Sequence, residues 1–248
     1  MAFSVCLEVA VGGRCMAHVM DLPGCSIRAE TREEALSALP RAVQEHMGWL
    51  ALHGETVDAA ADPLGLAVVS EEMGTGPFDP GDAAALFPQD LVPIALDEME
   101  RFFCLLAYSR SDLLALVCHL PDDLLDRVPC PDAFSIRRIL RHVGNAEEWY
   151  VSRIVPADSL PADWKDDEAL PIFGFLDMER RTALEQLRSL DETQRSSVFH
   201  PVVWTEHPEE GWTARKVLRR FAEHEREHAR QIEALLASSG VPASPAPP

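Results

Sequence analysis

A change in hydrophobic period near residue 90 constrains the fold of this 248-residue chain more than any other feature of its sequence. Beyond that point, apolar residues recur every three or four positions, as they do along one face of an α-helix. Four amphipathic segments follow, at Leu91–Leu120, Ser135–Val155, Leu176–Leu190 and Thr213–Ala237. Four helices of this length predict an all-α four-helix bundle over residues 91–238.

The second and fourth of these segments repeat one another. The sequence FSIRRILR, which begins at Phe134, matches WTARKVLR, which begins 78 positions later at Trp212. The same offset places Glu225 opposite Glu147. We therefore interpret the two segments as equivalent members of a duplicated αα unit. His142 falls opposite Arg220 in this alignment, so the repeat does not account for the histidines.

Residues 1–73 predict a small α+β domain, with an antiparallel sheet and one helix. Segments 3–9, 15–20 and 25–29 favour β-strands. A helical segment follows at 31–54, and a further candidate strand lies at 64–69. Gly12 and Gly13 separate the first two as a turn would, which favours a β-hairpin. Thr31 and Glu34 have the spacing of a capping box, which predicts where the helix begins.

Motifs in this first domain resemble the HicB-like domain of antitoxins. They are D-L-P-G-C at 21–25, T-R-E-E-A at 31–35 and the helix ending W-L-x-x-x-G at 49–54. In that family, DNA binding depends on an added helix-turn-helix or ribbon-helix-helix segment, and nothing of that kind follows here. The resemblance therefore implies a fold more than an antitoxin activity.

Composition marks two segments that join or follow these domains. Residues 74–90 are rich in glycine and proline near their start, which is typical of a linker between domains. Residues 239–248 are mostly proline, serine and alanine, with nothing to bury, which predicts a disordered tail.

The charge of the chain narrows the classes of partner. A formal net charge of −19 argues against binding to nucleic acid or to an anionic membrane, because both need lysines and arginines to neutralise phosphates. No signal peptide or membrane-spanning run is visible, and the six cysteines show no C-x-x-C pair. We expect a cytoplasmic protein with reduced thiols and a small-molecule substrate, and a homodimer is one option for its oligomeric state.

Three histidines in two of the predicted helices point to a metal site. His224 and His228 have i, i+4 spacing and lie in the middle of the apolar stripe of segment 213–237. His142 falls on the inward side of segment 135–155. Each unsatisfied imidazole nitrogen inside a bundle costs about 1–3 kcal/mol, and a shared divalent metal removes that cost. We therefore predict that these three histidines bind a divalent metal.

The same region resembles the DinB/YfiT family of metal-binding bundles. The resemblance rests on the long first helix, the F/W-S/T-x-R-x-I/V-L-R start before His142 and the H-x-x-x-H motif of the last helix. It implies a divalent metal, commonly zinc, nickel or iron, held by the positions of His142, His224 and His228, with an open position for water or substrate. Some relatives are transferases or isomerases that act with low-molecular-weight thiols.

Two kinds of function remain open from the sequence. In the first, the protein is a metal-dependent enzyme that activates a small-molecule thiol or water, as a thiol S-transferase or a hydrolase. No general base stands out, so catalytic residues are not assigned. In the second, it is a non-catalytic binding or regulatory protein with a structural metal, and the HicB-like domain recognises a partner.

Other side chains have weaker claims on the site. Glu147, Glu225 or a backbone carbonyl could hold the second nitrogen of a metal-bound imidazole. For His46 and His53, a solvated or helix-terminal position is favoured over metal ligation. The arginine pair at 219–220 is expected on an outward face with acidic neighbours.

Overall fold

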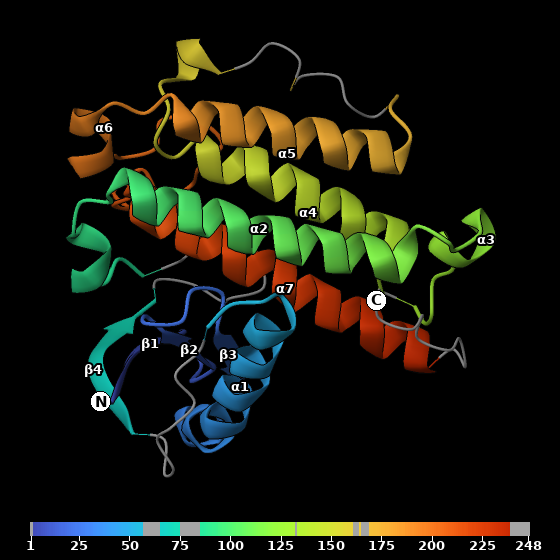
Figure 1. The fold of residues 1–248 in the computed structure, drawn as a ribbon, viewed down its shortest axis with the longest axis horizontal. Helices are drawn as coiled ribbons and strands as arrows, with labels where there is room; N and C mark the ends of the chain where they lie inside the picture. The colour runs from blue at the N-terminus through green and yellow to red at the C-terminus, as the bar shows by residue number, and fades with distance from the viewer. Residues whose placement is uncertain are drawn as a thin grey trace.

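The computed structural model describes residues 2–56, 65–74, 85–131, 133–160, 164 and 169–238. Its elements are β1 (Phe3–Val9), β2 (Cys15–Val19), β3 (Ser26–Ala29), α1 (Arg32–Leu52), β4 (Leu66–Met73), η1 (Pro88–Leu91), α2 (Leu96–Val117), α3 (Asp122–Leu125), α4 (Ile136–Val151), η2 (Ala157–Ser159), α5 (Ile172–Arg188), α6 (Glu192–Ser196) and α7 (Ala214–Ser238). Most of the predicted linker, residues 75–84, and the predicted tail lie outside the described residues. Figure 1 shows the sheet and α1 beside a layer of long helices, next to α7.

The four long helices α2, α4, α5 and α7 form the predicted bundle. Helix α7 packs against α2 and α4, and α4 also packs against α5 (Figure 1). Helix α5 begins at Ile172, four residues before the predicted Leu176, with Pro171 at its N-cap. None of the helices in the described part of the chain is long and apolar enough to cross a membrane.

The repeat in the sequence corresponds to a repeat in helix capping. The hydroxyl of Ser135 accepts a hydrogen bond from the backbone N–H of Arg138 at 3.3 Å, at the start of α4. The hydroxyl of Thr213 accepts one from the backbone N–H of Lys216 at 3.1 Å, at the start of α7. These residues are equivalent in the 78-residue alignment, so the two helices begin in the same way.

A buried network of two carboxylates and two arginines joins all four helices of the bundle. Arg180 donates from Nε to Glu147 at 2.9 Å and from Nη2 to Glu225 at 2.8 Å. Arg110 donates to Glu225 at 2.5 Å and also to Glu147. Glu147 and Glu225 are the pair that the repeat makes equivalent, and both are almost fully buried. Each carboxylate thus contacts both arginines, which compensates the cost of burying its negative charge.

The N-terminal sheet has the strand order β3-β2-β1-β4. Strands β1, β2 and β3 are antiparallel as predicted, whereas β4 runs parallel to β1, so the sheet is mixed. Alternate side chains point to opposite faces of a strand. One face packs on α1, and the other carries Cys6, Glu8 and His18 toward the bundle. Both faces of β1 and β2 are therefore covered, which makes this sheet part of the interior.

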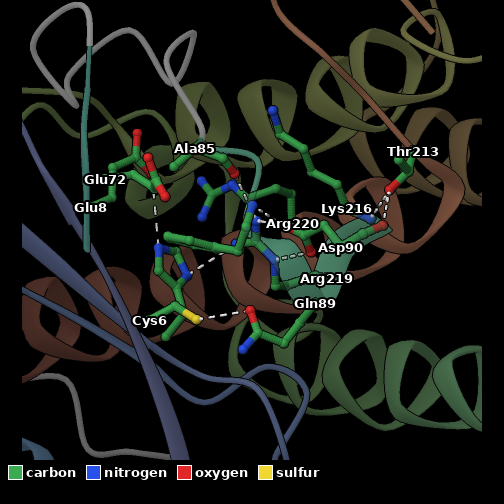
Figure 2. A network of polar contacts seen from close by, with 12 residues as sticks. Cys6, Glu8, Glu72, Ala85, Gln89, Asp90, Thr213, Lys216, Arg219 and Arg220 are labelled. Carbon is green, nitrogen blue, oxygen red and sulfur yellow. Dashed lines mark hydrogen bonds and ion pairs between the residues drawn. The ribbon is translucent and has the colours of Figure 1, made fainter. Parts of the chain in front are cut away.

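Charged side chains connect the sheet to α7. His18 Nδ1 lies 2.8 Å from Glu223 Oε1, and Arg220 donates to Glu223 at 2.8 Å. Arg219 donates to both oxygens of Asp90, at 2.9 and 2.8 Å, as Figure 2 shows. The prediction that Arg219 and Arg220 lie on an outward face was wrong. The N-terminal domain covers this part of α7, and the sequence of the helix alone gives no sign of it.

Gly144 of α4 lies directly against the ring of Phe175 of α5. A Cβ atom at this position would lie 2.3 Å from Cε1 of Phe175, far inside van der Waals contact. We expect Gly144→Ala to lower the free energy of unfolding by about 1–3 kcal/mol, measured by urea denaturation. Gly174→Ala in α5 is the matched control, because nothing lies within 4 Å of its Cβ and alanine favours a helix. Equal effects of both changes would contradict the close contact.

His46 in α1 is completely buried, not solvated as predicted, with its ring 5.2 Å from that of Trp49. Burial, together with the charges of Arg226 and Arg230, lowers its pKa to about 3. The folded protein thus keeps His46 neutral while the unfolded chain protonates it below pH 6.5. Stability should be complete above pH 6.5 and fall toward pH 3, by up to about 1.4 kcal/mol per pH unit. Between pH 7 and 5, the free energy of unfolding measured by urea denaturation should fall less steeply in His46→Leu than in the wild type. The control His200→Leu changes an exposed histidine and should match the wild type. Equal slopes in all three proteins would contradict the prediction.

Candidate metal centre

Three imidazoles converge between α4 and α7. His142 projects from α4, and His224 and His228 project from successive turns of α7. The Nε2 atom of His224 lies 3.0 Å from that of His142 and 3.2 Å from that of His228. The structure therefore brings together the three histidines that the sequence singled out, and we call them the histidine cluster.

The spacing of these nitrogens suits a single divalent metal. Zinc binds imidazole nitrogen at about 2.0–2.1 Å, and a tetrahedral arrangement then separates two such nitrogens by about 3.3 Å. The observed separations of 3.0 and 3.2 Å are close to that value. Three facing Nε2 atoms cannot all be satisfied by hydrogen bonds to one another, whereas one cation satisfies all of them. The residues present therefore fit a metal in their donor atoms and in their spacing.

Local electrostatics keep the histidine cluster in the form that binds metals. Burial, with a smaller contribution from His228, lowers the pKa of His142 to about 4. Burial and the two neighbouring histidines hold the pKa of His224 well below its usual range, and burial also lowers that of His228. All three rings are thus neutral near pH 7, with lone pairs available for a cation.

The cluster is open on one side. His224 is 7% exposed, whereas His142 and His228 are both partly exposed. The expectation that all three point fully inward was therefore correct only for His224. Along α7, residues 221–225 are buried and residues 226–230 are partly exposed. The helix emerges from the interior between the two ligand candidates, so the site is accessible to solvent.

Gln231 orients one of the rings. The Nδ1 atom of His228 lies 2.8 Å from the side-chain oxygen of Gln231, which accepts a hydrogen bond from Nδ1–H. This contact fixes the tautomer that leaves Nε2 free to bind a metal. Of the candidates for such a role that the sequence left open, Glu147 and Glu225 do not fill it, because both bind arginines in the bundle core. The i, i+3 spacing from His228 to Gln231 was the signal that could have identified it.

No fourth protein ligand joins the cluster within the described ranges. His142, His224 and His228 are the one group of histidine, cysteine or carboxylate side chains there that could hold a metal. Tyr150 packs edge-on against His224, with ring centroids 5.8 Å apart. His53 is elsewhere, at the C-cap of α1, 3.0 Å from Asp112. Three protein ligands and one open position are typical of catalytic rather than structural zinc sites.

Comparison with known proteins places this geometry in a family. A model of the DinB superfamily matches residues 105–232, just over half of the chain and all of the histidine cluster. Among solved structures, the chain is similar to YfiT from Bacillus subtilis, described as a probable metal-dependent hydrolase with an unusual four-helix bundle topology. That similarity has 17% sequence identity and a TM-score of 0.45, and covers 59% of this chain and 90% of YfiT. No curated protein matched the chain. By the family match, the chain belongs to the DinB superfamily.

Proposed function

We propose that the protein is a metal-dependent enzyme that activates a small-molecule thiol or a water molecule. His142, His224 and His228 would hold a divalent metal, of which zinc, nickel and iron are the candidates. The observation that carries the proposal is the convergence of three neutral imidazoles, which no fourth protein ligand joins among the residues that the structure describes. Such a set leaves the charge of the metal undiminished and a coordination position free.

The residues around the cluster have separable roles in this proposal. When bound, the metal would lower the pKa of a thiol or water and supply a nucleophile near pH 7. Because His142 comes from a different helix, it fixes the site only when α4 and α7 are packed together. Gln231 holds the ring of His228 in its metal-binding tautomer. Tyr150, which is 2% exposed, packs against the ring of His224 on the inner side of the site.

Turnover tests separate the two versions of this chemistry. The metal-loaded protein would be incubated with a panel of low-molecular-weight thiols and electrophiles, and separately with ester and amide substrates without thiol. Product that depends on added thiol supports a thiol S-transferase, and product without thiol supports a hydrolase. Both versions require His224, so turnover that is unchanged in His224→Ala would contradict the proposal.

The structure favours this proposal over a non-catalytic regulatory protein. In that alternative, the metal is structural and residues 1–73, which resemble a HicB-like domain, recognise a partner. A structural zinc site is normally closed by four protein ligands, whereas three converge here. Both faces of β1 and β2 are also covered, by α1 and by α7. The faces of these two strands are therefore not available to a partner.

Gln231 provides a direct test of the metal site that does not depend on activity. We expect Gln231→Ala to weaken metal binding by about 10- to 100-fold, because His228 loses the hydrogen bond that orients it. Gln231→Glu retains an oxygen acceptor and should keep most of the affinity. Competition with a chelating dye measures both. A Gln231→Ala variant that binds metal as tightly as the wild type would contradict the orienting role.

A further inference from the structure

An arginine of the N-terminal domain lies beside the open side of the histidine cluster. Arg28 is on β3, the edge strand of the sheet, and it pairs in register with Met16. Met16 lies 3.6 Å from Arg220 of α7, so this row of side chains faces the bundle. Arg28 Nε forms an ion pair with Oε1 of Glu227 at 2.6 Å. The sheet thus places a permanent positive charge on the surface of the metal-binding helix.

The position of Glu227 on α7 locates this ion pair relative to the cluster. Glu227 follows His224 by three residues, so the two side chains are neighbours on the surface of α7. Glu227 lies in the partly exposed stretch 226–230, where the site is open. The ion pair is therefore at the mouth of the site.

Contacts on both sides of Arg28 hold the strand in this position. Arg230 donates to the backbone carbonyl of Ser26 at 3.4 Å, on the same strand. Further along the interface between the sheet and α7, His18 Nδ1 lies 2.8 Å from Glu223 Oε1. The turn before β3 also lies close to α7, because a Cβ atom added at Gly24 would be 3.5 Å from the Cβ of Ala222. Arg28 is thus presented to the site by packed structure.

We propose that the N-terminal domain completes the metal centre, with Arg28 as a positioning residue that favours an anionic group at its open side. The inference rests on the proposed function and adds a substrate class, namely small molecules with negative charge near the reacting group. A guanidinium is always charged, and its planar donors suit carboxylate or phosphate oxygens. In the absence of an anion, the ion pair with Glu227 compensates the charge of Arg28 and orients its side chain.

Removing either member of the ion pair should change metal and anion binding in opposite directions. Arg28→Gln leaves Glu227 uncompensated, so the site should bind a divalent cation more tightly and an anion more weakly. Glu227→Gln removes the negative charge beside Arg28, so both effects should reverse. When water screens it fully, one unit of charge about 4 Å away changes a dissociation constant roughly fivefold.

The experiment uses the full chain loaded with cobalt(II), whose visible absorption reports on its ligands. Azide serves as the anionic probe, titrated into the wild type, Arg28→Gln, Glu227→Gln and the control Arg32→Gln. Arg32 is in the same domain and forms an ion pair of similar kind with Glu71, at 2.9 Å. We expect azide to bind about fivefold more weakly to Arg28→Gln, about fivefold more tightly to Glu227→Gln, and unchanged to Arg32→Gln. Cobalt affinity, measured by chelator competition, should move the opposite way.

The outcomes separate this inference from the proposed function. If the wild type binds no cobalt, the proposed metal site is wrong, and so is the role proposed for Arg28. If cobalt binds but azide affinity is the same in Arg28→Gln and the wild type, the metal site stands and this inference is overturned. Equal weakening in Arg28→Gln and Arg32→Gln would also overturn it, since the effect would then reflect net charge and not position. A cobalt-loaded Arg28→Gln protein shows at the same time that the variant is folded.

Discussion

Replacing His224 with alanine is expected to reduce the affinity for divalent metal by at least about 100-fold. His224 lies between the other two imidazoles, 3.0 and 3.2 Å from their Nε2 atoms, so its loss removes the central donor. Removing a residue that only orients a ligand already costs 10- to 100-fold in many metal sites, and removal of a ligand should exceed that. Competition with a chelating dye measures the dissociation constant, with metal content of the purified protein as a second readout.

His200→Ala is the matched control for this prediction. His200 is exposed, lies outside the histidine cluster and should bind metal like the wild type when replaced. Circular dichroism should show native helix content in both variants, because helix α7 is also held by the bundle core. If His224→Ala retains full metal affinity while folded, the assignment of the cluster as a metal site is wrong.

Replacing Arg180 with methionine is expected to lower the free energy of unfolding by about 3–5 kcal/mol. Arg180 is 8% exposed and donates to both Glu147 and Glu225. Methionine keeps most of the side-chain volume but leaves two buried carboxylates to share Arg110. An uncompensated buried charge is far more costly than a lost surface contact. Urea denaturation at pH 7 measures the change.

The adjacent Arg181 offers a control of the same residue type on the same helix. Its ion pair with Asp177 is 3.4 Å long, and the two side chains are 61% and 76% exposed. Arg181→Met should therefore change the free energy of unfolding by less than about 0.5 kcal/mol. Comparable destabilisation by both substitutions would show that the buried network does not carry the stability assigned to it.

The helices of the bundle were predictable because each carries its own signal. A 3.6-residue apolar period extends over many turns in α2, α4 and α7, and the caps Ser135 and Thr213 mark where two of them begin. The short helices α3 and α6 were missed, since four or five residues are too few to show a period. In the first domain, the alternation of apolar and polar residues indicated the strands. The parallel pairing of β4 with β1 depends on contacts between residues that are far apart in the sequence.

The candidate site was predictable in its ligands and not in its surroundings. The i, i+4 spacing of His224 and His228 is local, so the sequence displays it directly. The role of Gln231 depends on which side-chain rotamer faces His228, and helical spacing alone allows several partners. Glu147 and Glu225 were misassigned for the same reason: their true partners are on helices 33 to 115 residues away in sequence.

By itself, the sequence determined the bundle, the duplicated helices and the three histidines, because periodicity and spacing within one helix specify which residues share a face. Only the tertiary structure decided that the Nε2 atoms converge to 3.0 and 3.2 Å and that the site stays open at His228. It also decided that Arg219 and Arg220 are buried and that Arg28 reaches α7. These facts depend on how one domain packs against another, and charged residues on a helix have the same local pattern whether solvent or a second domain covers them.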